Sequence, residues 1–323
     1  MRHAQVIEAD VTWLGDRFER GVKVEVDGRG KIARVSKDGK ATRRLEGRAL
    51  LPGFVSAHSH AFQRGLRGLG EQFPKGAGSF WTWREAMYEL VEGLTPERAY
   101  SLSKRCFEEM RATGFTCVGE FHYIRHAGEG IDFELDEAVA RAAKDAGIRM
   151  RLLHTFYARG GFGQELAGGQ RRFDTPDVET YWERMDALEK VIDPATQSLG
   201  AVAHSVRAAE MEDVAALHAE ARRRGMVFHM HVEEQRKEIE ACEKATGKRP
   251  MELLLERLEI GNEFTAVHCT HTSAAAMKKF GAAGANVCLC PMTEGNLGDG
   301  VADWASIDAS GAGVCIGTDS NLR

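Results

Sequence analysis

From residue 50 onward, short runs of apolar and small residues alternate with longer amphipathic segments. Helical patterns such as residues 96–114 and 211–225 separate most of the short runs, and both end at a glycine, as helices often do. Strands that alternate with crossover helices form a parallel sheet, and eight of them close a TIM barrel. We therefore predict an α/β fold, a (β/α)8 barrel, with eight strands in LLPGFVSAHSH (50–60), TCVGEFHYI (116–124), RMRLLHTFY (149–157), LGAVAHSVR (199–207), VFHMHVEE (227–234), FTAVHCTH (264–271), NVCLCPMTE (286–294) and GVCIGTDS (313–320).

The first 50 residues have a different pattern. Residues 21–36, GVKVEVDGRGKIARVS, alternate apolar and polar positions around a glycine-rich turn, which is typical of a half-exposed hairpin. We expect residues 1–50 to form the N-terminal part of a small β domain, a β-sandwich element, and residues 51–323 to form the barrel. The chain stops four residues after Asp319, with no helix behind the eighth strand, so a C-terminal part is expected to be missing.

Composition narrows the class of protein. A net charge of −5 over 323 residues gives no electrostatic reason to expect nucleic acid as a partner. No apolar run is long enough to cross a membrane, and the first residues lack the apolar core of a secretory signal. The seven cysteines are scattered and suggest neither a disulfide framework nor a four-cysteine zinc site. These features predict a reduced, cytoplasmic protein that acts on a small molecule.

Histidine and acidic residues gather at the ends of the predicted strands, where TIM barrels place their functional groups. His58 and His60 lie two residues apart and therefore share one face of the first strand. Together with His231 and Asp319 they make three imidazoles and one carboxylate, a suitable ligand set for zinc. His229, on the same strand as His231, stays open as an alternative ligand. The remaining strand ends carry His122, Tyr123, His154, His204, Arg207, Glu234, His268, His271, Thr293 and Glu294, whereas His3, His126 and His218 are expected at the surface.

Two further groups have a chemical interpretation. Glu234 follows His231 by three residues and could move protons in the same pocket, while His268 could stabilise a developing charge. Arg84 and Arg207 could clamp carboxylates. From the residues alone, however, an ion pair at the surface is the commoner fate of an arginine. Gln63 and Tyr123 belong to the same predicted group at the mouth of the barrel.

Several motifs together resemble one family. LPGFVSAHSHAFQRGLRGL, GEFHYI, HMHVEEQRKEIEAC, VHCTH and IGTDS are similar to segments of the amidohydrolase superfamily. SFWTWREAMYEL and LCPMTEGNLGDG are more specific and resemble the formimidoylglutamate deiminase family within it. The resemblance runs from about residue 50 to the last residue. One departure is Ala203, where the family's pattern leads us to expect a proline.

The resemblance implies a function and a set of site residues. It implies hydrolysis of N-formimino-L-glutamate to N-formyl-L-glutamate and ammonia in histidine degradation, by a homodimer. One divalent metal ion, most often zinc, would be held by His58, His60, His231 and Asp319, which selects His231 over His229. His204 stands where two-metal relatives often have a carboxylated lysine, so a single metal is expected. The residues that would bind the substrate's carboxylates or line its pocket are Gln63, Arg84, Tyr123, His204 and Arg207.

The expected mechanism assigns three proton-handling roles. Asp319 takes a proton from metal-activated water, Glu234 protonates the departing nitrogen, and His268 stabilises the tetrahedral intermediate. The alternative is another deaminase of the same superfamily, acting on a purine, a pyrimidine or a related C=N substrate. Arg84 and Arg207 favour the acyclic dicarboxylate over a ring.

Overall fold

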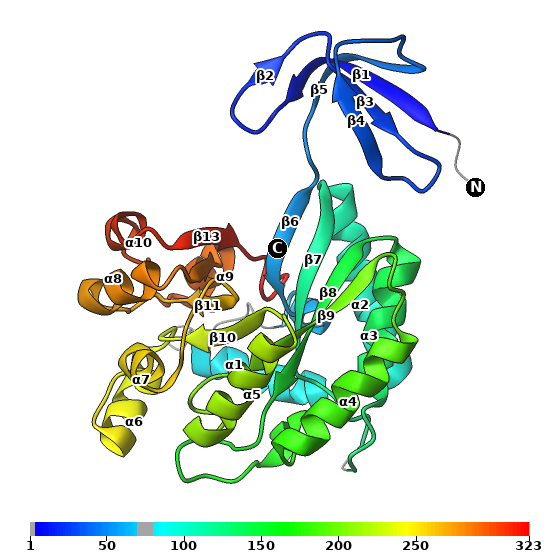
Figure 1. Cartoon of the computed structure of the whole chain (residues 1–323). Helices are drawn as coiled ribbons and strands as arrows, with labels where there is room; N and C mark the ends of the chain where they lie inside the picture. Colours follow the sequence, from blue (N-terminus) through cyan, green and yellow to red (C-terminus); the bar gives the residue numbers. More distant parts are fainter. Residues whose placement is uncertain (1–3, 70–79, 129, 323) are drawn as a thin grey trace. The chain divides into compact units, whose positions relative to one another are not determined.

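The computed structural model describes residues 4–69, 80–128 and 130–322 (Figure 1). The chain divides into two compact units, Met1–Phe54 and Val55–Arg323.

The first unit is built around a five-stranded sheet. Its strands are β1 (Gln5–Trp13), β2 (Phe18–Glu19), β3 (Lys23–Val26), β4 (Ile32–Ser36) and β5 (Arg43–Leu50), in the order β2-β1-β3-β4 with β5 paired to β1. The predicted hairpin is confirmed as the antiparallel pair β3 and β4. At its turn the Asp27 carboxylate accepts the backbone N–H groups of Arg29 and Lys31, both at 2.9 Å, which is how aspartate stabilises tight turns.

The second unit contains the eight predicted parallel strands, arranged side by side in chain order. They are β6 (Phe54–Ser59), β7 (Phe115–His122), β8 (Arg149–Phe156), β9 (Gln197–Ala203), β10 (Phe228–Val232), β11 (Phe264–His268), β12 (Asn286–Leu289) and β13 (Gly313–Ile316). Each overlaps one predicted run. The prediction of a (β/α)8 barrel is therefore confirmed.

The ring closes at the carboxyl end of its first strand. Ser59 and Asp319 form a parallel bridge just beyond β13. The backbone N–H of Asp319 donates to the carbonyl of His58 at 3.0 Å, and the N–H of His60 donates to the carbonyl of Asp319 at 2.8 Å. These bonds fix Asp319 directly beside the histidine pair of β6.

Helices connect most of the strands and pack around the barrel (Figure 1). The predicted helix at residues 96–114 is observed as α2, capped by the Thr95 hydroxyl, which accepts the N–H of Arg98. None of the helices in the described ranges combines the length and the apolar character needed to cross a membrane. The helices are α1 (Phe80–Glu92), α2 (Pro96–Ala112), α3 (Glu134–Ala146), α4 (Val178–Val191), α5 (Met211–Arg223), α6 (Arg236–Thr246), α7 (Pro250–Arg257), α8 (Ala274–Ala282), α9 (Pro291–Leu297) and α10 (Trp304–Ser310), with short 3-10 turns η1 (Ala61–Leu66) and η2 (Gly168–Phe173).

Two histidines that we expected at the surface are buried, and that expectation was wrong. His126 accepts backbone N–H groups from Asp132 and Phe133 through its Nδ1. His218 forms a 2.9 Å hydrogen bond with Glu263. Each ring satisfies its polar atoms inside the protein, which removes the cost of burying it. His3 lies outside the described residues.

Candidate active site

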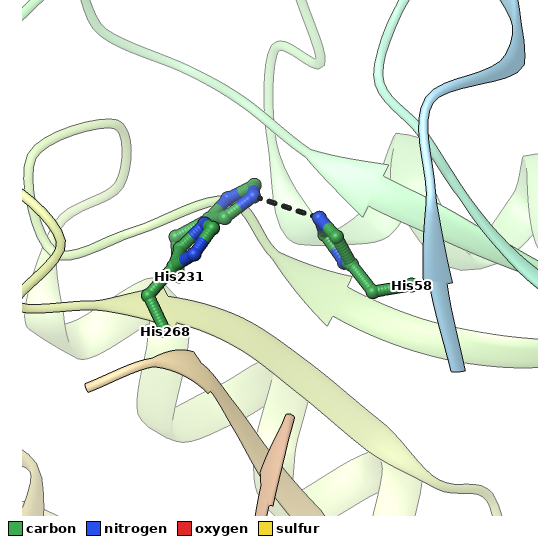
Figure 2. A group of neighbouring side chains, drawn as sticks. All are labelled: His58, His231 and His268. Carbon is green, nitrogen blue, oxygen red and sulfur yellow. Dashed lines mark hydrogen bonds between the residues drawn. The ribbon is translucent and has the colours of Figure 1, made fainter. Parts of the chain in front are cut away.

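Four side chains converge at the carboxyl ends of the barrel strands. The Nε2 atoms of His58 and His60 are 3.1 Å apart. Those of His58 and His231 are 3.3 Å apart (Figure 2). Asp319 Oδ1 lies 3.4 Å from the Nε2 of both His58 and His60. Around a tetrahedral zinc ion with bonds of about 2.0–2.1 Å, neighbouring ligand atoms lie about 3.3–3.4 Å apart. The distances from His58 to His60, His231 and Asp319, and from His60 to Asp319, therefore match those between ligands of one tetrahedral metal ion. His58 belongs to two candidate ligand groups, one with His60 and Asp319 and one with His231 and His268.

Hydrogen bonds prepare two of the imidazoles as ligands. Nδ1 of His60 lies 2.8 Å from the carbonyl of Phe121, and Nδ1 of His231 lies 3.1 Å from the carbonyl of His204. A carbonyl only accepts, so each Nδ1 carries the hydrogen and each Nε2 presents its lone pair to the centre. Burial lowers the pKa of His60 to about 3 and holds the pKa of His231 well below its ordinary value. Both rings are thus neutral, the form that binds a metal.

Asp319 supplies the anionic member of the cluster. Burial would raise its pKa, but hydrogen bonding and electrostatic attraction from His58, together with His268 and His60, hold that pKa well below the usual range. Its φ of +52° is uncommon for a residue other than glycine, and His268 is similar at +74°. Such backbone conformations persist where the surrounding structure enforces them, as at functional sites.

His268 and Glu234 flank the cluster. The ring of His268 stacks on that of His231 with centroids 5.4 Å apart (Figure 2), and its Nε2 lies 3.8 Å from Glu234 and 3.9 Å from Asp319. Burial raises the pKa of Glu234 to about 8. Burial would lower the pKa of His268, but the carboxylates of Glu234, Glu294 and Asp319 raise it to about 10. Glu234 and His268 therefore retain at least one proton between them near neutral pH.

His268 also meets the spacing of a ligand. One nitrogen each from His58, His231 and His268 lies within 4.8 Å of the other two (Figure 2). Its contacts with carboxylates on both ring edges, and the raised pKa that they cause, suit a proton donor better than a metal ligand. His229 joins none of the candidate ligand groups found among the described residues. It lies two positions before His231 in β10, farther from the carboxyl end.

A cavity of about 530 Å³ opens over the cluster. Gln63 donates from Nε2 to the hydroxyl of Tyr123 at 2.8 Å, and Arg84 donates from Nε to the hydroxyl of Tyr88 at 2.6 Å. Arg84 and Arg207, the two arginines predicted at the mouth, both line this cavity. Its lining includes all five residues predicted to bind substrate, Gln63, Arg84, Tyr123, His204 and Arg207.

Three acidic residues near the site have contacts that sequence reasoning missed. Glu120 accepts the N–H of Ala61 at 2.7 Å and so fixes the chain immediately after His60. Glu238 lies in the first turn of α6 and lines the cavity. Glu294 had been noted only as a strand end, yet it contacts His268. A carboxylate inside an otherwise apolar strand, as at Glu120, was the available signal, because such burial requires a partner.

A parallel barrel with a cluster of histidine and aspartate side chains at its carboxyl mouth is the architecture of a barrel enzyme, and sequence comparison gives the family. The profile of the amidohydrolase family matches residues 49–322, so the chain belongs to this family. It is accordingly a hydrolase that acts on carbon–nitrogen bonds.

Individual relatives narrow the comparison. The chain is 37% identical over 323 residues to a formimidoylglutamate deiminase of Pseudomonas aeruginosa, covering 98% of this chain and 71% of that protein. It is 27% identical to a 5-methylthioadenosine/S-adenosylhomocysteine deaminase of Natronomonas pharaonis, covering 90% of this chain and 62% of the relative. A crystal structure of an amidohydrolase from Brucella melitensis superposes with a TM-score of 0.92 at 36% identity, over 99% of this chain and 72% of that one.

Proposed function

We propose that this protein hydrolyses N-formimino-L-glutamate to N-formyl-L-glutamate and ammonia, with one zinc ion as its cofactor. One observation carries the proposal: two guanidinium groups, Arg84 and Arg207, line the same cavity as the histidine–aspartate cluster. Such a cavity matches a substrate with two carboxylates and one hydrolysable C=N group. The 37% identity to the Pseudomonas aeruginosa deiminase supports the same substrate.

The metal would be held by His58, His60, His231 and Asp319. His58 Nε2 lies 3.1, 3.3 and 3.4 Å from donor atoms of the other three, as it would around a tetrahedral ion. When bound there, a zinc ion lowers the pKa of water and polarises the reacting group. Three imidazoles and one carboxylate favour zinc over magnesium or calcium, which prefer oxygen ligands.

The protein's own groups then divide the proton transfers. Asp319, an ionised carboxylate, takes a proton from the water that attacks the formimino carbon. Glu234, which retains a proton near neutral pH, donates to the departing nitrogen, so that ammonia leaves and the C=O bond of the formyl group forms. His268 donates toward the tetrahedral intermediate and stabilises its charge.

Substrate binding would depend on the arginines. Burial would lower the pKa of Arg207, but Tyr157 and Glu238 favour the charged guanidinium and raise it. Arg84 is oriented by its bond to Tyr88. Each can pair with one carboxylate of the glutamate moiety, while the linked Gln63 and Tyr123 offer further hydrogen bonds. His204 completes this part of the cavity wall.

A deaminase of ring substrates is the second candidate, supported by the 27% identity to the 5-methylthioadenosine/S-adenosylhomocysteine deaminase. The two candidates differ in what they require of the cavity, since 5-methylthioadenosine has no carboxylate and S-adenosylhomocysteine has only one, whereas N-formimino-L-glutamate has two for Arg84 and Arg207 to bind.

The test is ammonia release by the zinc-loaded protein from N-formimino-L-glutamate, with 5-methylthioadenosine and adenosine measured in parallel. We expect release from the first substrate only, its loss on chelation, and its return when zinc is added. Faster release from a ring substrate would refute the proposed substrate. Activity that survives complete removal of the metal would refute the proposed mechanism.

We further propose, from the family resemblance, that the enzyme acts as a homodimer in the cytoplasm. Light scattering on the purified protein would measure the mass, and a monomer at all concentrations would contradict the first part. Cell fractionation would test the second.

A further inference from the structure

Glu294 lies in the first turn of α9 and is almost fully buried, with 5% of its surface exposed. Its Oε1 accepts the backbone N–H of Cys290 at 2.8 Å. The same oxygen lies 3.3 Å from Nδ1 of His268. The carboxylate therefore joins the start of α9, after β12, to the residue at the end of β11.

The two ring edges of His268 face different groups. Nδ1 faces Glu294, whereas Nε2 faces Glu234 and Asp319, at 3.8 and 3.9 Å. Oε1 of Glu294 acts as an acceptor, since it already accepts the N–H of Cys290, so its contact with the ring places a hydrogen on Nδ1. It also fixes the rotation of the ring, since the orientation of a histidine is commonly set by such a partner.

The backbone conformation at His268 makes the orientation of its ring depend on contacts with other side chains. His268 and Cys269 have φ values of +74° and +52°, so the chain leaves the regular strand geometry exactly where the ring projects. The ring of His268 is 1% exposed, and its remaining neighbours include the stacked ring of His231. Stacking limits tilt, but a stacked ring can still rotate in its own plane or flip.

We propose that Glu294 is a positioning residue: it holds His268 with Nδ1–H toward itself and Nε2 toward the reacting atoms. This inference rests on the proposed function for its effect on catalysis, because His268 acts there as a donor toward the intermediate. Without Glu294, a flipped or rotated ring would turn Nε2 away from Glu234 and Asp319.

Two other roles for Glu294 are less well supported. As a cap only, it would satisfy the N–H of Cys290 and leave His268 unaffected, but the same oxygen contacts both groups. As a metal ligand, it would act with His268 and Cys290, whose donor atoms lie within 4.8 Å of one another. The oxygen that such a site would use already accepts the backbone N–H of Cys290 and faces Nδ1 of His268, so its contacts are accounted for without a metal.

Kinetics of Glu294→Ala and Glu294→Gln, in the zinc-loaded protein, test the inference. For Glu294→Ala we expect kcat to fall about 10- to 100-fold, the usual cost of losing such a partner, with KM within about twofold and zinc content unchanged. Glu294→Gln should recover most of kcat, since its amide oxygen can accept both hydrogen bonds. Met292→Ala, at an exposed position of α9, is the matched control and should behave as wild type.

Unchanged kcat in Glu294→Ala would overturn the inference. So would equal losses of kcat in the alanine and glutamine variants together with loss of zinc, since that pattern indicates a structural role. If the alanine variant fails to fold, the glutamine variant and a spectroscopic measurement on wild type still test whether Glu294 positions His268.

The spectroscopic measurement is independent of catalysis. Two-bond 1H–15N correlation spectra of histidine-labelled protein report which ring nitrogens carry a hydrogen. The His268 signals are assigned by their loss in His268→Gln. We expect a protonated Nδ1 in wild type and a changed pattern in Glu294→Ala. A neutral ring protonated only on Nε2 in wild type would overturn the inference. Failure of wild type to release ammonia from N-formimino-L-glutamate would instead overturn the proposed function.

Discussion

Replacing Arg207 tests the substrate assignment most directly. Arg207 follows β9, lines the cavity, and its charged form is favoured by Tyr157 and Glu238. Arg207→Ala removes the guanidinium but leaves the candidate metal ligands in place, because none of the hydrogen bonds that orient His231 involves its side chain. A loss of activity in this variant would therefore report on substrate binding.

The expected magnitude follows from the geometry of a guanidinium–carboxylate pair. Such a pair can form two parallel hydrogen bonds, and a hydrogen bond to a charged group contributes about 1.5–3 kcal/mol. Losing both should cost about 3–6 kcal/mol of transition-state stabilisation, which at about 1.4 kcal/mol per tenfold is a loss of about 10²- to 10⁴-fold in kcat/KM. Arg207→Lys should fall between, because lysine keeps the charge but not the planar fork.

The assay is steady-state ammonia release, with zinc content measured on the same samples. Arg223→Ala is the control: this arginine is 70% exposed and pairs with Glu220 on the surface, so its loss should change kcat/KM by less than about twofold. Two substrate analogues, each lacking one carboxylate, sharpen the result. Toward the analogue that lacks the carboxylate bound by Arg207, the Arg207→Ala variant should be nearly as active as wild type. Wild-type KM in Arg207→Ala, or equal losses on both analogues, would refute the reasoning.

Three further predictions concern the metal, a buried network and pH. His60→Ala should bind no zinc, so that added zinc raises the thermal midpoint of wild type but not of the variant, as calorimetry would show. Asp136→Asn should lower the free energy of unfolding by about 3–5 kcal/mol in urea titrations, because the buried Asp136 carboxylate lies 3.0 Å from both His122 and His154. A smaller loss would contradict a charged interaction between Asp136 and these histidines. Burial raises the pKa of Glu120 from 4.5 to about 8. The contribution of this group to the free energy of unfolding should therefore be largest below about pH 4.5 and decline as the pH rises through about 8. Glu120→Gln should flatten this decline in the stability–pH profile.

Local pattern determined much of this protein before any contact was known. The alternation of strand-like and helical runs was enough to predict eight parallel strands, because the spacing of apolar residues indicates which strands and which helix faces are buried. The i, i+2 spacing placed His58 and His60 on one face for the same reason. Motif resemblance supplied the family, and the sequence profile confirmed it.

Tertiary structure decided which distant groups meet. His229 and His231 differ only in their depth along β10, and only the packing of β10 against the rest of the barrel brings His231 to within 3.3 Å of His58. The burial of His126 and His218 likewise depends on partners that lie far from them or in irregular loops. Glu294 shows most clearly what sequence alone cannot predict. It is 26 positions from His268 and becomes its neighbour only through the register of β11 and the turn into α9. Periodicity encodes the face on which a residue lies, whereas the distance between two faces is set by how whole elements pack.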